Sequence, residues 1–167
     1  GMTSHDYSKD LKPGKCMYNA TALALDNLEG LVDEALQDDK FMALKDSEKQ
    51  HTLVVEWSGA NDLITINKVP THAAADCAVA ARIQQVTRLI EAGYTQFVVF
   101  NLPDLSLTPR FQNSDEASIN LANEVSTYFN TCLSDALSTL RIQNQHCQIH
   151  LFDANQLFSE AYVHPTL

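Results

Sequence analysis

Three short apolar runs, separated by segments of helical length, constrain the fold of this chain more than any other sequence feature. The runs are residues 53–57, 97–100 and 147–152, and valine, isoleucine, leucine and aromatic residues dominate them. Such runs are typical of buried strands. Between them, apolar residues recur at helical spacing over residues 73–92 and from Ile119 to Leu140. This alternation predicts right-handed βαβ crossovers and a three-layer α/β fold with a parallel sheet, formed as one domain over residues 1–167.

The segments around these runs are less regular. Residues 1–15 are predicted to be an extended polar lead-in, residues 20–38 an amphipathic helix, residues 45–51 a polar linker after a second short helical stretch, and residues 109–113 a loop. Ser114 is predicted to cap the long helix that follows, and Gly93 to stop the helix before the second strand. A short helix is expected over residues 154–161. Trp57 is expected in the core, and His150 to be partly buried.

Composition and charge exclude several classes of function. The formal net charge is -10, which disfavours nucleic acid and anionic membrane surfaces as partners. No run approaches the ~18 apolar residues that a membrane span needs. The four cysteines form no C-x-x-C pair, so they are expected to be free and mostly buried thiols. No spacing of His, Cys and Asp predicts a metal site, and no cofactor is implied.

The compartment is not determined by the sequence. Gly1 ahead of Met2 has the form left by a cleaved purification tag, so a targeting segment removed during cloning would leave no trace. The sequence is compatible with a soluble protein of the cytoplasm or a secreted one.

Chemistry is expected where the strands end, because open α/β sheets bind ligands at the carboxyl ends of their strands. Residues 58–64, 101–111 and those from Asp153 onward follow the three runs. Asn61, Asn101 and Asp104 therefore border the expected cleft. Each also has an ordinary structural interpretation, as an Asx turn or a strand-ending turn. The functional interpretation makes the Asn61 amide a donor to a developing oxyanion, a role that contributes roughly 2.7–4 kcal/mol in acyl transfer.

An ordered set of motifs resembles the GDSL/SGNH-type lipases and esterases. Gly59-Ala60-Asn61-Asp62 resembles the family's G-x-N-D block, including the strand before it. Residues 97–109 resemble its "nLPdLglTP" strand and loop, Asn130 falls in an "fN-x-x-L" helix, and residues 149–153 resemble its next strand. The resemblance covers residues 16–165 in order. It implies an SGNH-hydrolase-like, flavodoxin-like fold and hydrolysis of carboxylic esters, including phospholipids or lysophospholipids, through a serine ester.

The resemblance carries only part of the catalytic set. It places Asn61 in the oxyanion hole, with Gly59 and Asp62 in the same block. The family's Gly-Asp-Ser block and the strand before it have no counterpart, and Ser8 and Ser4 are the nearest candidate nucleophiles. Gly14 is a weak match to a second glycine of the hole. His164 resembles the histidine of the "D-x-x-H-P-T" block, but Ala161 stands where that block has Asp, and an alignment to a non-catalytic stretch fits the spacing from Asp153 better.

Three interpretations follow from these gaps. In the first, the chain is part of a larger hydrolase and incomplete at both ends, so that the catalytic Ser and Asp–His pair lie outside it. In the second, it is a divergent hydrolase that uses Ser8 or Ser4 with His164. In the third, it is a catalytically dead relative that binds ligands or proteins. Without the family's nucleophile strand, the edge of the strand at Val54–Trp57 would be open. Since open edges are rarely tolerated, a second copy of the chain, a swapped segment or the N-terminal residues are expected to cover it.

Overall fold

A three-stranded parallel sheet forms the centre of the computed structural model, which describes residues 2–5, 27–66 and 69–164. The strands are β1 (Leu53–Glu56), β2 (Gln96–Phe100) and β3 (Gln148–Phe152), in the order β1-β2-β3. Val54 pairs with Phe97, and Phe97 with Ile149, so the carboxyl ends of the strands lie at the same edge of the sheet. The expected α/β fold with a parallel sheet is confirmed.

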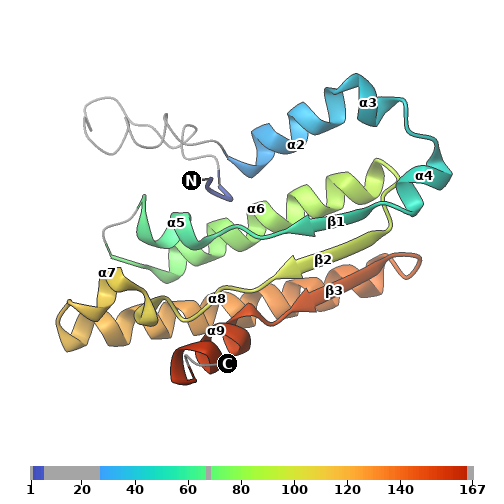
Figure 1. Cartoon of the computed structure of the whole chain (residues 1–167). Coiled ribbons are helices and arrows are strands. Elements are labelled where there is room, and N and C mark those ends of the chain that lie inside the picture. The colour runs from blue at the N-terminus through green and yellow to red at the C-terminus, as the bar shows by residue number, and fades with distance from the viewer. Residues whose placement is uncertain (1, 6–26, 67–68, 165–167) are drawn as a thin grey trace, which may run out of the picture.

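Helices α6 and α8 cover one face of this sheet and pack against each other (Figure 1). The helices are α2 (Leu28–Gln37), α3 (Asp39–Met42), α4 (Asp46–Gln50), α5 (Ala60–Ile64), α6 (His72–Glu91), α7 (Pro109–Gln112), α8 (Glu116–Gln143) and α9 (Ala154–Val163), with a 3-10 turn η2 (Leu105–Leu107). Phe97, Val99 and Ile149 point into the core beneath α6 and α8, where Phe129 and Leu133 of α8 are fully buried. The hydrophobic stripes in the sequence thus correspond to this layer.

Polar residues at the helix ends explain where the helices begin. Thr71 accepts a hydrogen bond from the backbone N–H of Ala74 at the start of α6, and Asp115 accepts one from Ser118 at the start of α8. The cap of α8 is therefore Asp115 and not Ser114, because the helix begins one residue later than the sequence pattern suggests. Gly93 follows α6 with φ of 101°, as its role as a stop signal predicts.

Two segments expected to be irregular are helical. Residues 46–50 of the predicted linker form α4, where the backbone N–H of Lys45 donates to the Glu48 carboxylate. Residues 109–112 of the predicted loop form α7, which Pro109 opens. Proline suits the first turn of a helix because its missing N–H has no partner there. The predicted lead-in over residues 6–15 and the start of the predicted helix at 20–26 lie outside the described residues.

The second face of the sheet is open among the described residues. Leu53 is 55% exposed and Val55 59% exposed, so the prediction of a fully buried first strand is wrong for this face. His150 is exposed for the same reason, since side chains alternate between the two faces of a strand. The third layer expected from the sequence is therefore not formed by residues 2–5, 27–66 and 69–164. Cys77 is also exposed, contrary to expectation, whereas Cys132 and Cys147 are partly buried free thiols.

The outer edge of β1 has no paired strand in the described part of the chain. Helix α2 lies alongside that edge and contacts α6 (Figure 1). A groove of about 280 Å³ separates α2 from β1, lined by Leu28, Val32, Val54 and Val55 among others. The expected open edge is thus present, and what covers it stays a prediction.

Candidate functional site

The turn after β1 carries the first candidate residues. Gly59 has φ of +110°, a left-handed conformation that favours glycine, and it begins α5. A Cβ atom on Gly59 would lie 2.7 Å from Cζ of Phe129, whose ring is fully buried. The absence of a side chain therefore lets the turn pass against α8, and this close approach sets the position of Asn61 at the carboxyl end of the sheet.

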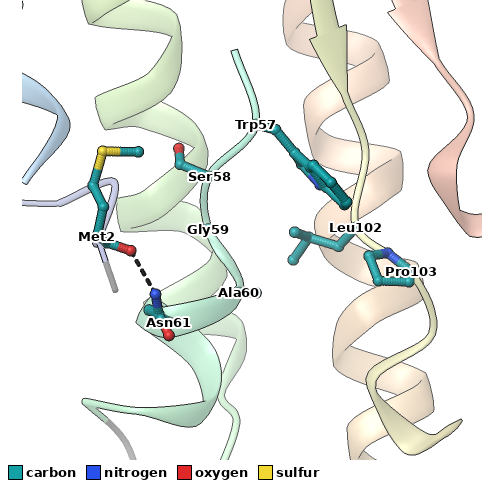
Figure 2. Close-up of a pocket in the computed structure, with 8 residues that line it drawn as sticks. All are labelled: Met2, Trp57, Ser58, Gly59, Ala60, Asn61, Leu102 and Pro103. Atoms are coloured by element: carbon teal, nitrogen blue, oxygen red, sulfur yellow. Dashed lines mark hydrogen bonds between the residues drawn. The ribbon is translucent and has the colours of Figure 1, made fainter. Parts of the chain in front are cut away.

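A pocket of about 200 Å³ opens beside this turn (Figure 2). Its walls are largely apolar; they are made by Met2, Trp57, Ser58, Gly59, Ala60, Asn61, Leu102 and Pro103. Trp57 was expected in the core but is 48% exposed, because it leaves β1 on the open side of the sheet and stacks on Phe100 at 5.2 Å. The sequence therefore supplies an aromatic wall to the pocket instead of a core residue.

The side-chain amide of Asn61 is oriented by two hydrogen bonds. Its Oδ1 accepts from the Thr65 hydroxyl at 2.8 Å, which turns Nδ2 the other way. Nδ2 donates to the backbone carbonyl oxygen of Met2 at 2.8 Å (Figure 2). The amide N–H thus already contacts a carbonyl oxygen at the wall of an apolar pocket, which is the kind of contact that an oxyanion donor makes.

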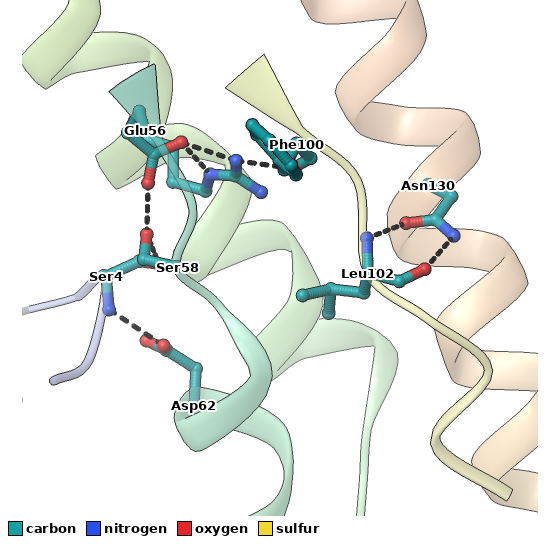
Figure 3. Close-up of polar contacts among 8 residues, drawn as sticks. Ser4, Glu56, Ser58, Asp62, Phe100, Leu102 and Asn130 are labelled. Carbon is teal, nitrogen blue, oxygen red and sulfur yellow. Dashed lines mark hydrogen bonds and ion pairs between the residues drawn. The ribbon is translucent and has the colours of Figure 1, made fainter. Parts of the chain in front are cut away.

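The opposite wall of the pocket is held by α8. Asn130 donates to the carbonyl of Leu102 and accepts from its N–H, both at 2.8 Å, so its side chain pairs with the backbone as a neighbouring strand would (Figure 3). Leu102 is fully buried. Asn130 belongs to the motif "fN-x-x-L" noted in the sequence, and its position gives that motif a structural role in fixing the wall.

A chain of buried polar groups lies behind the turn (Figure 3). Arg82, which is 0% exposed, donates from Nε to Glu56 at 2.6 Å and forms an ion pair with the same oxygen through Nη2. Nη2 also donates to the carbonyl of Phe100 at 2.7 Å. The Ser58 hydroxyl donates to the other oxygen of Glu56 at 2.5 Å. These bonds link the ends of β1 and β2 and fix the residue that precedes Gly59.

The hydroxyl of Ser4 completes this chain. Its oxygen lies 2.7 Å from that of Ser58, and because the Ser58 proton is given to Glu56, Ser4 is the donor of this bond. Asp62, fully buried, accepts from the backbone N–H groups of Ser4 at 2.7 Å and His5 at 2.9 Å. The Asp62 carboxylate of the G-x-N-D block therefore binds the backbone of Ser4 and His5, and Asp62 is not among the residues that line the pocket.

Hydrogen bonds join the segment that follows β2 to the segment that follows β3. Asn101 donates to the Asp153 carboxylate at 2.9 Å and accepts from the backbone N–H of Asn155, also at 2.9 Å. The backbone N–H of Gln156, then the Asn101 amide, lower the pKa of Asp153 below its ordinary value. Asp104 accepts from Ser106 N–H and from the Asn123 amide. Asn101 and Asp104 thus make the turns of their structural interpretation, and neither is among the residues that line the pocket.

The remaining candidates lie elsewhere. His164 ends α9 and is exposed, and it is not among the pocket-lining residues. Ser8 and Gly14 lie outside the described residues. Ser4 lies near the turn but is 1% exposed. No group of His, Cys, Asp and Glu among the described residues has the geometry to hold a metal ion.

Sequence reasoning missed Glu56 and Arg82, although each had a signal. Glu56 interrupts an apolar strand at a position that alternation directs inward, beside Val54. Arg82 lies between Val79 and Val86, within the apolar stripe of its helix. A single inward acid and a single inward base predict a buried pair, because charges in a core are normally paired.

Comparison with known proteins gives two matches. A family model described as GDSL-like Lipase/Acylhydrolase matches residues 14–165. The chain is also 29% identical over 146 residues to a phosphatidylcholine-sterol acyltransferase of Aeromonas hydrophila. That alignment covers 87% of this chain and 40% of the relative, so the chain spans less than half the length of the curated protein it matches.

Proposed function

Because the chain belongs to the GDSL-like lipase/acylhydrolase family, we propose that it is the Asn61-bearing part of a serine ester hydrolase or acyltransferase. In this reaction a serine oxygen attacks the ester carbonyl carbon, the alcohol leaves, and a water or a second alcohol releases the acyl group from the serine. Asn61 Nδ2 donates to the carbonyl oxygen as it gains negative charge. An oxyanion donor of this kind accelerates the reaction by about 10²–10³.

One observation carries this proposal. The Asn61 amide donates to a carbonyl oxygen at 2.8 Å beside a mostly apolar pocket. The carbonyl belongs to the chain itself, but its bond shows the direction in which the amide can donate. Apolar walls exclude water and strengthen such a bond. The site therefore supports binding of a group that combines a carbonyl oxygen with an apolar chain, which describes an ester of a fatty acid.

We further propose that the nucleophilic serine and the Asp–His pair lie outside this chain. Ser4 is buried and donates its proton into the Ser58–Glu56 chain. Ser8 as nucleophile and His164 as base remain alternative assignments. The substrate proposed is a carboxylic ester, with a phospholipid as the natural acyl donor, in line with the phosphatidylcholine named for the relative. No helix within the described ranges has the length and apolar character required to cross a bilayer.

A second candidate function is ligand or protein binding without catalysis. The observation that favours it is that the Asn61 amide already donates to a carbonyl of the chain, while Ser4, the candidate nucleophile among the described residues, is 1% exposed. A binding module would need the pocket but neither a nucleophile nor a base.

The two candidates are separated by incubating the folded chain with a fluorophosphonate and measuring its intact mass. We expect no adduct from this chain alone. A stoichiometric adduct mapped to Ser8 or Ser4 would place a complete active site here and contradict our assignment of the nucleophile. If a longer form that includes more of the gene is labelled once, and Asn61→Ala in that form lowers ester hydrolysis about 10²–10³-fold, the hydrolase proposal is supported. An unlabelled, inactive longer form favours the binding module.

The open face and edge of the sheet belong to the same proposal. We propose that the complete fold has three layers and that the edge of β1 is covered in solution, by a second copy of the chain, a swapped segment or N-terminal residues. Light scattering across a concentration series tests the first of these. A monomer at all concentrations, with rapid hydrogen exchange at Val54–Trp57, would contradict every form of cover.

A further inference from the structure

Residues Met2–His5 lie directly over the candidate site. Thr3 is 2% exposed and Ser4 1% exposed, so this short segment is buried more completely than many strand residues. The Met2 side chain lines the pocket, and the Met2 carbonyl accepts from Asn61 (Figure 2). The same residue therefore supplies the acceptor for the Asn61 amide and part of the pocket wall.

The segment is fastened at three places. The Thr3 carbonyl accepts from Leu28 N–H at 2.9 Å, and Thr3 forms a parallel bridge with Asn27. The Asp62 carboxylate accepts from two successive backbone N–H groups, those of Ser4 and His5. The Ser4 hydroxyl donates to Ser58 and so joins the buried chain that ends at Arg82 (Figure 3). These bonds fix the backbone that follows the Met2 carbonyl.

The chemistry of this contact resembles that of the proposed substrate. An amide carbonyl and an ester carbonyl both accept a hydrogen bond at oxygen, and the thioether chain of methionine is apolar and flexible, as an acyl chain is. Since Asn61 Nδ2 faces one carbonyl in this arrangement, a substrate carbonyl that approaches the same N–H must displace that of Met2. The observed association constant then equals the intrinsic one multiplied by the fraction of molecules in which the segment has lifted.

We propose that Met2–His5 form an internal strap whose Met2 carbonyl competes with a neutral carbonyl ligand for the Asn61 amide at the wall of the pocket. The inference rests on the proposed function in one respect, that the pocket binds the carbonyl end of an ester-like molecule. It assigns the Ser4–Ser58–Glu56–Arg82 chain and Asp62 to fastening the strap. Release of the strap, by cleavage or by displacement, opens the site.

The test measures binding of N-butylacetamide, a neutral amide that matches a short ester in shape and is not hydrolysed by a serine hydrolase. Trp57 is the only tryptophan of the chain and lines the pocket, so its fluorescence reports occupancy. Ser4→Ala removes the donor to Ser58 but leaves Ser58 bonded to Glu56, so no buried donor is left without a partner. Removing one such bond is expected to increase affinity about two- to tenfold.

Two further variants sharpen the result. A chain that begins at Ser4 lacks the competing carbonyl and is expected to bind more tightly than Ser4→Ala; Asn61→Leu in that shortened chain is expected to abolish the gain. Ser138→Ala is the matched control, because its exposed hydroxyl bonds only within α8, to Ser134 O, and it should leave affinity unchanged.

The outcomes separate the strap from the hydrolase proposal. A folded shortened chain that binds no more tightly than the full chain would overturn the strap. If shortening prevents folding, Ser4→Ala decides, and an unchanged affinity in that variant rejects the inference. Fluorophosphonate labelling reports catalysis independently. The labelling is read on the longer form described above, since no adduct is expected from this chain alone. Tighter binding by the strap variants with no labelling of the longer form supports the strap while the catalytic role fails. Labelling of the longer form with unchanged binding by the strap variants supports the catalytic role alone.

Discussion

Replacing Gly59 with alanine tests whether the turn that positions Asn61 depends on the absence of a side chain. Two terms oppose the substitution. The φ of +110° is a strained conformation for alanine, worth about 1–3 kcal/mol. The new Cβ would also lie 2.7 Å from Cζ and 3.0 Å from Cε2 of Phe129.

The overlap with Phe129 cannot be relieved by a small side-chain rotation. The ring is 0% exposed and packs between α8 and the sheet, so it is not the free end of a flexible chain. Overpacking of this kind typically costs about 1–3 kcal/mol. The two terms together predict that Gly59→Ala lowers the free energy of unfolding by about 2–6 kcal/mol.

Urea denaturation followed by circular dichroism measures this change. Gly30→Ala is the matched control, because Gly30 lies in α2, its nearest neighbour to a new Cβ is at 3.5 Å, and alanine favours a helix by about 1 kcal/mol. In a Phe129→Leu background, Gly59→Ala should cost less than in the parent chain, because the ring that overlaps the new Cβ is gone. The backbone strain at position 59 should remain. A loss below about 1 kcal/mol in Gly59→Ala would refute the reasoning, since neither term could then operate as described.

Two other predictions follow from the buried pair and the third strand exit. Arg82→Met leaves the Glu56 carboxylate buried without its cation and should lower the free energy of unfolding, measured by urea denaturation, by about 3–5 kcal/mol. The double variant Arg82→Met, Glu56→Leu should recover most of that loss. Equal losses in the two variants would contradict the pairing. The pKa of Asp153 is lowered in the folded state, so its carboxylate stabilises the fold above the unfolded pKa and this contribution is lost as the pH falls through the folded pKa. Asp153→Asn should therefore be less stable than the parent chain at pH 7, and the difference in denaturation midpoint should shrink as the pH is lowered; a difference that stays constant on acidification would disprove the assignment.

The sequence predicts the sheet and its main helices because these depend on local patterns. The apolar runs at 53–57, 97–100 and 147–152 each form a strand whose ends lie within one residue of the run. Helix α6 differs from its predicted range by one residue at each end, and Gly93 stops it as expected. Periodicity cannot report which face of a strand is covered, since that depends on segments distant in the chain. Trp57 and Val55 were misplaced for this reason.

The candidate site was predicted in part. The G-x-N-D block identified Gly59 and Asn61 as neighbours of a pocket, because a short motif records both the turn and the donor. The roles of Asp62 and Ser4 were not visible, because they depend on a contact between residues 58 positions apart. The same limit applies to Arg82, which meets Glu56 across 26 residues. Residue type shows that a buried charge needs a partner, but only the fold shows which partner it finds.

The position of Trp57 connects the open sheet face with the candidate site. Its ring stacks on Phe100, lies 6.1 Å from the ring of Phe158 on α9, and also lines the pocket beside Asn61. A segment or second copy that covers the open face as far as Trp57 therefore also contacts a wall of the pocket. Cover of the sheet and access of a ligand are consequently coupled through one side chain. A cover that holds Trp57 against Phe100 would fix the Trp57 wall of the pocket. Release of Met2–His5 at the Asn61 wall would still admit the ligand.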